Sequence, residues 1–368
     1  MNLVKQRVSN PLFYPVSLPR LLALNLGTLA FTLIKAALKG LKMRGSTLPV
    51  KLLIGAIALL TFILVSCIQE PPKPLRIGTN VWPGYEPLFL ARELGYYGNT
   101  PIKLVEYPNL DPNRPYRNGE VEMSATPMNG LLELAQTNPD VRAWLVMDVS
   151  DGADAIVAKP EIANLQSLKR RRVGMERSPL AAFVLTRGLE QVGLSLKDVK
   201  IVHVELSEQE EALKQGRVDA VVTFEPHRSN LLATGAKILF DSTQIPGEVV
   251  DVLVGSKSLL SDHATQLQVL MQGWFRALDY IKNNPEDAAR RMARRQGVTP
   301  EQFLESLKGL RLVDLEENQK LLGKTNPVLL NGAKRLSQFL EKNKILKQEV
   351  EPSPLLDDRL VRNLKDKG

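Results

Sequence analysis

The stretch Leu75–Tyr97, LRIGTNVWPGYEPLFLARELGYY, constrains the fold more than any other part of the chain. Leu75–Thr79 predicts a short buried strand, and residues 87–94 have the apolar spacing of a helix that stops at a glycine. The helix opens on a proline, which fits a first turn where the N–H group has no helical partner. Trp82 and Tyr85 lie in the loop between them, and α/β proteins commonly bind ligands at such strand ends. The stretch therefore predicts an α/β fold with a binding site near these aromatic residues.

The positive charge of the chain is confined to its beginning. The sequence holds 48 Lys and Arg residues against 40 Asp and Glu residues. Eight of the basic residues lie in 1–66, which contain no acidic residue, so the rest of the chain is balanced. A basic face for nucleic acid is therefore not expected.

Cys67 is the single cysteine, which excludes a disulfide within the chain and a cysteine metal cluster. Residues 52–66, LLIGAIALLTFILVS, form an apolar run behind Lys51 that is too short to favour a spanning helix. The run ends in LVSC, which resembles the lipobox of bacterial lipoproteins, so we expect lipid attachment at Cys67 and an extracytoplasmic protein anchored to the cell envelope. The alternative is a buried cysteine at the end of a signal anchor. Residues 1–42 are interpreted as an over-extended start, or else as a real apolar segment.

The remaining chain alternates predicted strands with predicted helices, which indicates a mostly parallel sheet. Residues 108–118 are rich in Pro, Asn and Asp and predict a loop, whereas Ser178 before Pro179 predicts a helix start. From Leu259 the chain becomes helical. The expected organisation is a leader and signal peptide in 1–66, the lipidated Cys67 and tether in 67–74, lobe 1 in 75–155, lobe 2 in 156–244, a return to lobe 1 with C-terminal helices in 245–350, and a tail in 351–368.

Six segments in the same order resemble one known family. They are LRIGTNVWPGYEPLFLARELGYY, GEVEMSATPMNGLLEL, DGADAIVAK, VGMERSPLAAFVLTRGLEQVGL, GRVDAVVTFEPH and FDSTQIPGEVVDVLVGS, which span residues 75–256. The chain is similar to the nitrate/sulfonate/taurine-type (NitT/TauT) substrate-binding proteins of ABC importers. The resemblance implies a type II periplasmic-binding fold, in which two α/β lobes close on a small molecule at a hinge. It also implies delivery to a permease and ATPase, as a monomer with no cofactor and no catalytic step.

The resemblance and the strand-end positions together predict which side chains line the ligand cleft. The predicted ligand-binding residues are Trp82, Tyr85, Thr126, Met128, Asn129, Asp151, Asp154, Glu176, Ser178, Glu225 and His227. Trp82 and Tyr85 would form an apolar wall or a cation–π face, or else simply cover the core. Ser178 could hold an anion at a helix start, although an ordinary N-cap is the alternative.

Four of these side chains are acidic: Asp151, Asp154, Glu176 and Glu225. If two or more face the cleft, a bare oxyanion would be repelled and a ligand with an amine or a cationic ring would be favoured. If instead they are solvated or paired with Arg177 or Arg228, a ligand of the sulfonate, nitrate or taurine class fits.

Two other readings of the chain stay open. His227 beside Glu225 resembles an acid–base pair, but no nucleophile or metal cluster accompanies it, and no GxGxxG motif occurs. An enzyme built on the same fold and a sensor lipoprotein without an importer are therefore the alternatives. The Arg-rich segment 289–297, ARRMARRQG, predicts a solvated helix face or a docking surface.

Overall fold

The computed structural model describes residues 73–107, 113–323 and 327–365. Residues 73–368 form one compact unit, and the predicted lipobox at Cys67 lies outside the described residues. None of the described helices has the length and apolar character needed to cross a bilayer.

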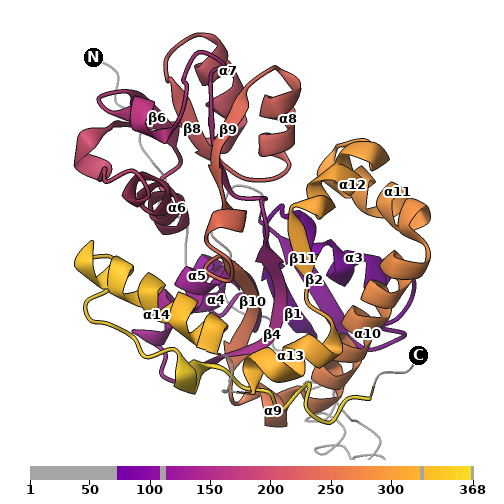
Figure 1. The fold of residues 1–368 in the computed structure, drawn as a ribbon. Helices are drawn as coiled ribbons and strands as arrows, with labels where there is room; N and C mark the ends of the chain where they lie inside the picture. The colour runs from indigo at the N-terminus through magenta and orange to yellow at the C-terminus, as the bar shows by residue number, and fades with distance from the viewer. Residues whose placement is uncertain (1–72, 108–112, 324–326, 366–368) are drawn as a thin grey trace, which may run out of the picture. The chain divides into compact units, whose positions relative to one another are not determined.

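Lobe 1 is built on a six-stranded sheet, in the order β11-β4-β10-β3-β1-β2 (Figure 1). β1 pairs in parallel with β2 and β3, whereas β10 runs antiparallel to β3 and β4, and β11 runs antiparallel to β4. The strands are β1 (Leu75–Thr79), β2 (Ile102–Glu106), β3 (Met123–Pro127), β4 (Val141–Ser150), β10 (Val250–Ser256) and β11 (Leu310–Leu312). The helices of this lobe are α3 (Glu86–Glu93), α4 (Asn113–Arg117), α5 (Met128–Ala135), α9 (Leu259–Asp262), α10 (Ala264–Asn283), α11 (Pro285–Gln296), α12 (Pro300–Lys308), α13 (Leu315–Leu322) and α14 (Pro327–Lys342).

Lobe 2 is built on a five-stranded sheet, in the order β7-β6-β8-β5-β9. β6 pairs in parallel with β7 and β8, and β5 runs antiparallel to β8 and β9. The strands are β5 (Ala155–Ala158), β6 (Arg172–Met175), β7 (Lys200–His203), β8 (Ala220–Thr223) and β9 (Lys237–Asp241). The helices are α6 (Pro179–Glu190), α7 (Gln209–Lys214) and α8 (His227–Ala233).

The chain crosses between the two sheets after β4 and after β9. Hydroxyl groups tie these crossings together: Ser150 Oγ lies 2.8 Å from Ser242 Oγ, which also accepts a hydrogen bond from Gly152 N at 2.7 Å. Helix α14 contacts both α5 and α6, and α12 contacts α8, so helices of lobe 1 reach lobe 2 on two sides. The two lobes are therefore in contact in this structure.

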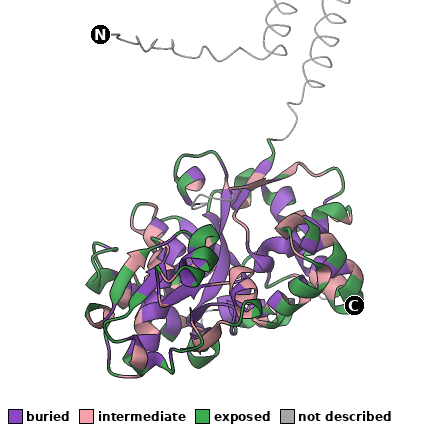
Figure 2. Cartoon of the chain, turned by 90° about the horizontal axis from the view of Figure 1, so that it is seen from above, coloured by how far each residue is buried: buried purple, intermediate pink, exposed green. Residues whose placement is uncertain are grey.

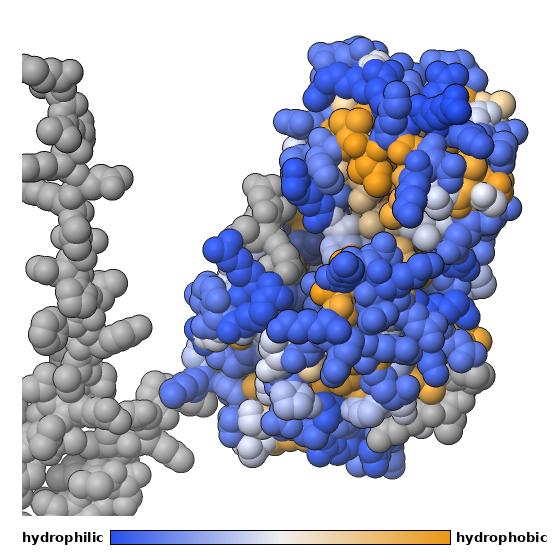
Figure 3. Space-filling view, turned by 90° about the vertical axis from the view of Figure 1, so that its left-hand side faces the viewer, coloured by the Kyte–Doolittle hydropathy of each residue, from blue (hydrophilic) through white to orange (hydrophobic). Residues whose placement is uncertain are grey.

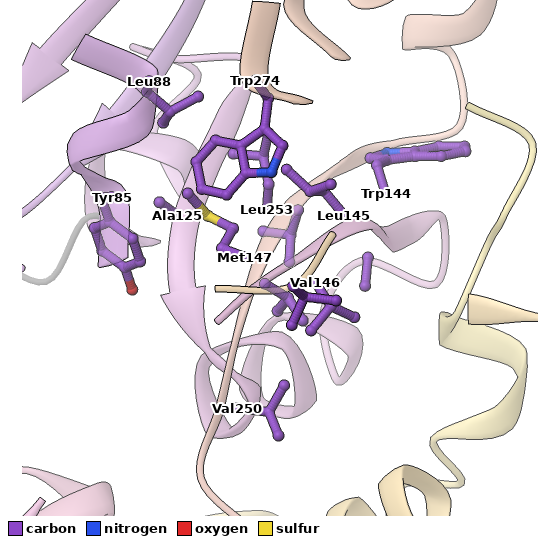
Figure 4. Packing of buried hydrophobic residues seen from close by; sticks show 14 of the residues in the cluster. Tyr85, Leu88, Ala125, Trp144, Leu145, Val146, Met147, Val250, Leu253 and Trp274 are labelled. Carbon is purple, nitrogen blue, oxygen red and sulfur yellow. The ribbon is translucent and has the colours of Figure 1, made fainter. Parts of the chain in front are cut away.

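The core of lobe 1 lies around the central strands β4 and β10. Every residue of β4 is buried, and Trp144 and Trp274 are fully enclosed (Figures 2 and 4). The surface seen in Figure 3 is mostly hydrophilic, with a group of hydrophobic side chains in its upper half. Burial of this apolar surface is the main stabilising contribution, at about 25 cal/mol per Å².

One prediction about the backbone is confirmed with exceptions, and another is wrong. Most strands of each sheet run in one direction, as predicted, but β10 and β11 in lobe 1 and β5 in lobe 2 run against them, so both sheets are mixed. The segment 108–118 is not all loop, since its described part contains α4. Asn113 Nδ2 donates to Thr126 Oγ1 at 2.9 Å, and this tertiary contact stabilises a helical turn that the composition does not predict.

Candidate functional site

Trp82 joins the two lobes at the end of β1. The one-turn helix η1 (Pro83–Tyr85) follows it, and Pro87 falls in the first turn of α3, as the sequence predicts. The indole Nε1 of Trp82 donates to Asp148 Oδ2 at 3.1 Å. Its ring meets Phe224 of lobe 2 edge to face, with 5.7 Å between centroids. Trp82 therefore lies at the lobe boundary and covers a buried carboxyl group.

Tyr85 brings a second aromatic ring to a second buried carboxyl group. The ring is buried against the lobe 1 core, and its hydroxyl oxygen points away from Leu88 (Figure 4). That hydroxyl group interacts with the carboxyl group of Asp251. Burial and the nearby carboxyl groups of Asp251 and Asp148 raise the pKa of Tyr85 well above its usual value, so it stays a neutral donor.

Asp148 and Asp251 stand directly opposite each other on β4 and β10. Both side chains are buried. Burial raises the pKa of Asp148 to about 7, with the Trp82 hydrogen bond opposing this shift and Asp154 adding to it. Burial and the neighbouring carboxyl groups also raise the pKa of Asp251 well above its usual range. We call Trp82, Tyr85, Asp148 and Asp251 the aromatic–carboxyl cluster.

A small pocket beside this cluster carries two more acids. Its cavity volume is about 10 Å³ in this structure, about enough for one water molecule, and we call it the acidic pocket. Its lining consists of Asp154, Glu176, Ser178, Leu180, Ala181, Val184, Val222, Thr223 and Phe224.

The acidic pocket contains buried acceptors without a partner. Asp154 Oδ2 and Thr223 Oγ1 have no hydrogen-bond partner, although Asp154 is only 4% exposed and Thr223 2%. Burial raises the pKa of Asp154 to about 6, against the hydrogen bond from Ser150. Burial also raises the pKa of Glu176, opposed by its hydrogen bond with Ser178. An unpaired buried acceptor is costly, so each of these atoms needs a hydrogen-bond donor from outside the chain, such as a water molecule or a ligand.

Ser178 has the capping role predicted for it. Its hydroxyl oxygen accepts a hydrogen bond from Ala181 N at 3.3 Å at the start of α6. The carboxyl group of Glu176 interacts with the same hydroxyl group, so an anion at this helix start would meet a carboxyl group.

The negative charge of Glu225 is balanced by Arg228 of the same lobe. It is fully buried and accepts from Arg228 Nη1 at 2.9 Å, from Ser229 N and Oγ at 3.2 and 2.9 Å, and from Ser306 Oγ at 3.3 Å. The pairing with Arg228 is the structural alternative that the sequence left open. Ser306 belongs to α12, so Glu225 also connects the lobes. His227 packs edge to face on Phe224, and burial lowers its pKa.

The other predicted site residues divide between lobe 1 and the surface. Thr126, Met128 and Asn129 are buried where β3 passes into α5, and Asn129 Oδ1 has no partner. Asp151 is exposed and lies outside the lining of the acidic pocket. The expected four-acid group is therefore reduced to Asp154 and Glu176 in the acidic pocket.

Sequence reasoning missed Asp148 and Asp251. A signal was present, because each is a lone acid inside a strand that is otherwise buried and largely apolar, and a buried carboxyl group needs a partner or a proton. The described residues hold no group of three or more His, Cys, Asp or Glu side chains suited to a metal ion. The arrangement as a whole presents acceptors and aromatic edges to a small ligand.

Known structures share this fold. The alkanesulfonate-binding protein SsuA from Xanthomonas axonopodis pv. citri, solved with MOPS, matches with a TM-score of 0.64 and 17% identity, over 79% of this chain and 100% of that one. The periplasmic aliphatic sulphonate-binding protein SsuA from Escherichia coli matches with a TM-score of 0.65 and 18% identity, over 78% and 98%. The desulfurization enzyme DSZB also matches, with a TM-score of 0.60 and 18% identity, over 78% and 98%. The predicted two-lobe α/β fold is confirmed.

One curated relative and one family model match the sequence. A putative thiamine biosynthesis protein from Haemophilus influenzae is 24% identical over 215 residues, which are 56% of this chain and 68% of the relative. The model described as NMT1/THI5 like matches residues 82–288, a span that holds both the acidic pocket and the aromatic–carboxyl cluster. Since this span is more than half of the sequence, the chain belongs to the NMT1/THI5-like family.

Proposed function

We propose that the protein is the extracytoplasmic solute-binding component of an ABC importer, that it binds a small molecule with an amine or a cationic ring, and that it passes this molecule on unchanged. Its similarity to sulfonate-binding proteins and to a ligand-binding component of an ABC-type import system supports the importer role. The lipobox-like LVSC motif supports a lipid anchor at Cys67. A permease and an ATPase would be its partners.

The acidic pocket carries the proposal for the ligand class. Asp154 is buried, has an oxygen without a partner and lies with Glu176 in the same small pocket. Within the described residues neither carboxyl group forms an ion pair, whereas Glu225 nearby forms one with Arg228. A sulfonate would add a negative charge to two carboxyl groups, but an ammonium or a protonated ring nitrogen would supply the missing donor. Similarity to a putative thiamine biosynthesis protein supports a nitrogen heterocycle as the first compound to test.

Function would follow from lobe closure. Trp82 of lobe 1 and Phe224 of lobe 2 meet at the boundary, next to the acidic pocket. A ligand that contacts both lobes stabilises the closed form by its differential affinity for the two forms.

A thermal-shift panel on the full-length protein tests this proposal. The panel holds thiamine, spermidine, taurine, ethanesulfonate and nitrate, and a compound at about 100 times its Kd should stabilise the protein by about 2.7 kcal/mol. We expect shifts with cationic compounds and none with ethanesulfonate or nitrate. Asp154→Asn should remove the shift, whereas the matched control Asp151→Asn alters an exposed carboxylate and should keep it.

Tight binding of ethanesulfonate by the wild-type protein would overturn the cationic ligand class. Mass spectrometry of the compound recovered after incubation decides between binding and catalysis. Recovery of a transformed product would favour an enzyme of the same fold.

A further inference from the structure

The Asp148–Asp251 pair has a geometry that two charged carboxylates do not tolerate. The residues face each other across the antiparallel β4–β10 pair, so both side chains project from the same face of the sheet. Residues directly opposite in such a pair have Cβ atoms about 5 Å apart, and like charges there are destabilising. The two side chains are 1% and 5% exposed, so water does not screen the repulsion.

No basic side chain in the described residues compensates the pair. Trp82 and Tyr85 of the neighbouring turn contribute neutral donors. Asp154 adds a third carboxyl group nearby, and Glu176 and Glu225 act on Asp154 in turn. On the other side of β4, the residue opposite Asp148 is Leu312 of β11.

The nearest cation on β11 cannot reach the pair. Arg311 is one residue from Leu312 and therefore points to the opposite face of the sheet, where it pairs with Glu317. With no basic partner, a buried carboxyl pair remains stable by holding a proton, as the raised pKa values of both residues also indicate.

We infer that the Asp148–Asp251 pair selects the charge of the ligand, because it holds a proton while the site is empty and exchanges that proton for a cationic group of the ligand. The second half of this inference rests on the proposed function. A cation that enters between Trp82 and Phe224 would stabilise the ionised pair and release its proton. A neutral or anionic solute would leave the proton in place and gain nothing from the pair. Because sulfonate-binding proteins share the fold, the pair and not the fold would set the preference for a cation.

The first experiment needs no ligand. Infrared difference spectroscopy on the full-length protein, with pH varied from 5 to 9, should show a buried protonated carboxyl band that disappears near or above neutral pH. The band should lose intensity in Asp148→Asn and in Asp251→Asn, and be unchanged in the control Asp151→Asn. Because burial also raises the pKa of Asp154, the variant Asp154→Asn identifies the part of the band that belongs to that residue. An unchanged band in both Asp148→Asn and Asp251→Asn would overturn the inference. Each Asn retains the size of the residue that it replaces, and its amide oxygen can still accept from Trp82 or Tyr85. Absence of the band at pH 6 in the wild type would overturn the inference, whatever the protein binds.

The second experiment measures the exchange. Thiamine keeps a positive thiazolium charge across the pH range, so it serves as the cationic probe. Isothermal titration calorimetry at pH 6.5, in two buffers of different ionisation enthalpy, should report the release of up to one proton. The Kd should then fall by up to tenfold for each pH unit between 6 and 8. In Asp148→Asn, the Kd for thiamine should no longer depend on pH in this range.

The outcomes separate this inference from the proposed function. Binding of thiamine without proton release would overturn the inference and leave the cationic ligand class standing. Failure of thiamine to bind, in protein whose carboxyl band titrates as expected, would overturn the exchange step and count against the ligand class. It would leave the protonated pair itself established.

Discussion

Replacement of Glu225 by alanine should destabilise the protein more than a typical surface substitution. The carboxylate is fully buried and accepts four hydrogen bonds, from Arg228, Ser229 and Ser306. Without it, the Arg228 guanidinium remains largely buried, with an Nε atom that already has no partner. Removal of one partner from a buried ion pair costs about 3–5 kcal/mol, and we expect a loss of about 4 kcal/mol. Urea unfolding, followed by both circular dichroism and tryptophan fluorescence, would measure the change.

A double-mutant cycle shows whether the ion pair is the cause. Arg228→Ala alone should be similarly costly, but the double variant should lose about 2 kcal/mol less than the sum of the single losses. Ser306→Ala removes only one hydrogen bond between the lobes and should cost about 1 kcal/mol. A loss below about 1 kcal/mol in Glu225→Ala, or strict additivity with Arg228→Ala, would refute the assignment of Glu225 to a structural role.

Two further predictions concern charges elsewhere in the chain. Arg295 of the Arg-rich helix α11 lies 3.4 Å from the ring centroid of Phe89 and pairs with the buried Glu86, so Arg295→Ala should cost about 2–4 kcal/mol in urea unfolding. Arg294 is exposed, so Arg294→Ala should change the free energy of unfolding by less than about 0.5 kcal/mol. If Arg295→Ala has no larger effect than Arg294→Ala, both arginines belong to a solvated face of α11. The raised pKa of Asp154 means that its contribution to stability is present below about pH 4 and is lost as pH rises through about 6. A pKa shift from 3.8 to about 6 corresponds to about 3 kcal/mol. The free energy of unfolding of Asp154→Asn, minus that of the wild type, should therefore increase by about 3 kcal/mol between pH 4 and 8. A difference that does not change with pH would contradict the raised pKa.

The local elements could be predicted because their signals lie within a few residues. The unit 75–97 forms the predicted strand, turn and helix. Ser178 caps α6, and α10 and α11 lie in the part of the chain that is predicted to be helical from Leu259. The reversed direction of β5, β10 and β11 was not predictable in this way. It depends on which strands pair after the chain has crossed to lobe 2 and returned, and no local pattern records that pairing.

The candidate site was predictable only in part, for the same reason. Positions at strand ends, such as Asp154 and Glu176, could be found from the sequence because strand ends are local features. The short helix α8 was missed, although its Arg228 is what neutralises Glu225. Whether an acid at a strand end has a basic partner depends on tertiary contacts, so the sequence left the ligand charge undecided.

The acids near the lobe boundary differ in what compensates them, and this difference defines the site. Glu225 has Arg228 and three other donors, so its charge is balanced before any ligand arrives. Asp154 retains an acceptor atom without a partner, and Asp148 faces Asp251 with only neutral donors beside them. A protein stable on its own would balance these groups as it balances Glu225, because an unpaired buried carboxyl group costs free energy. On the function proposed above, the compensating charge comes from outside the chain: a proton while the site is empty, and a cationic solute when it is occupied.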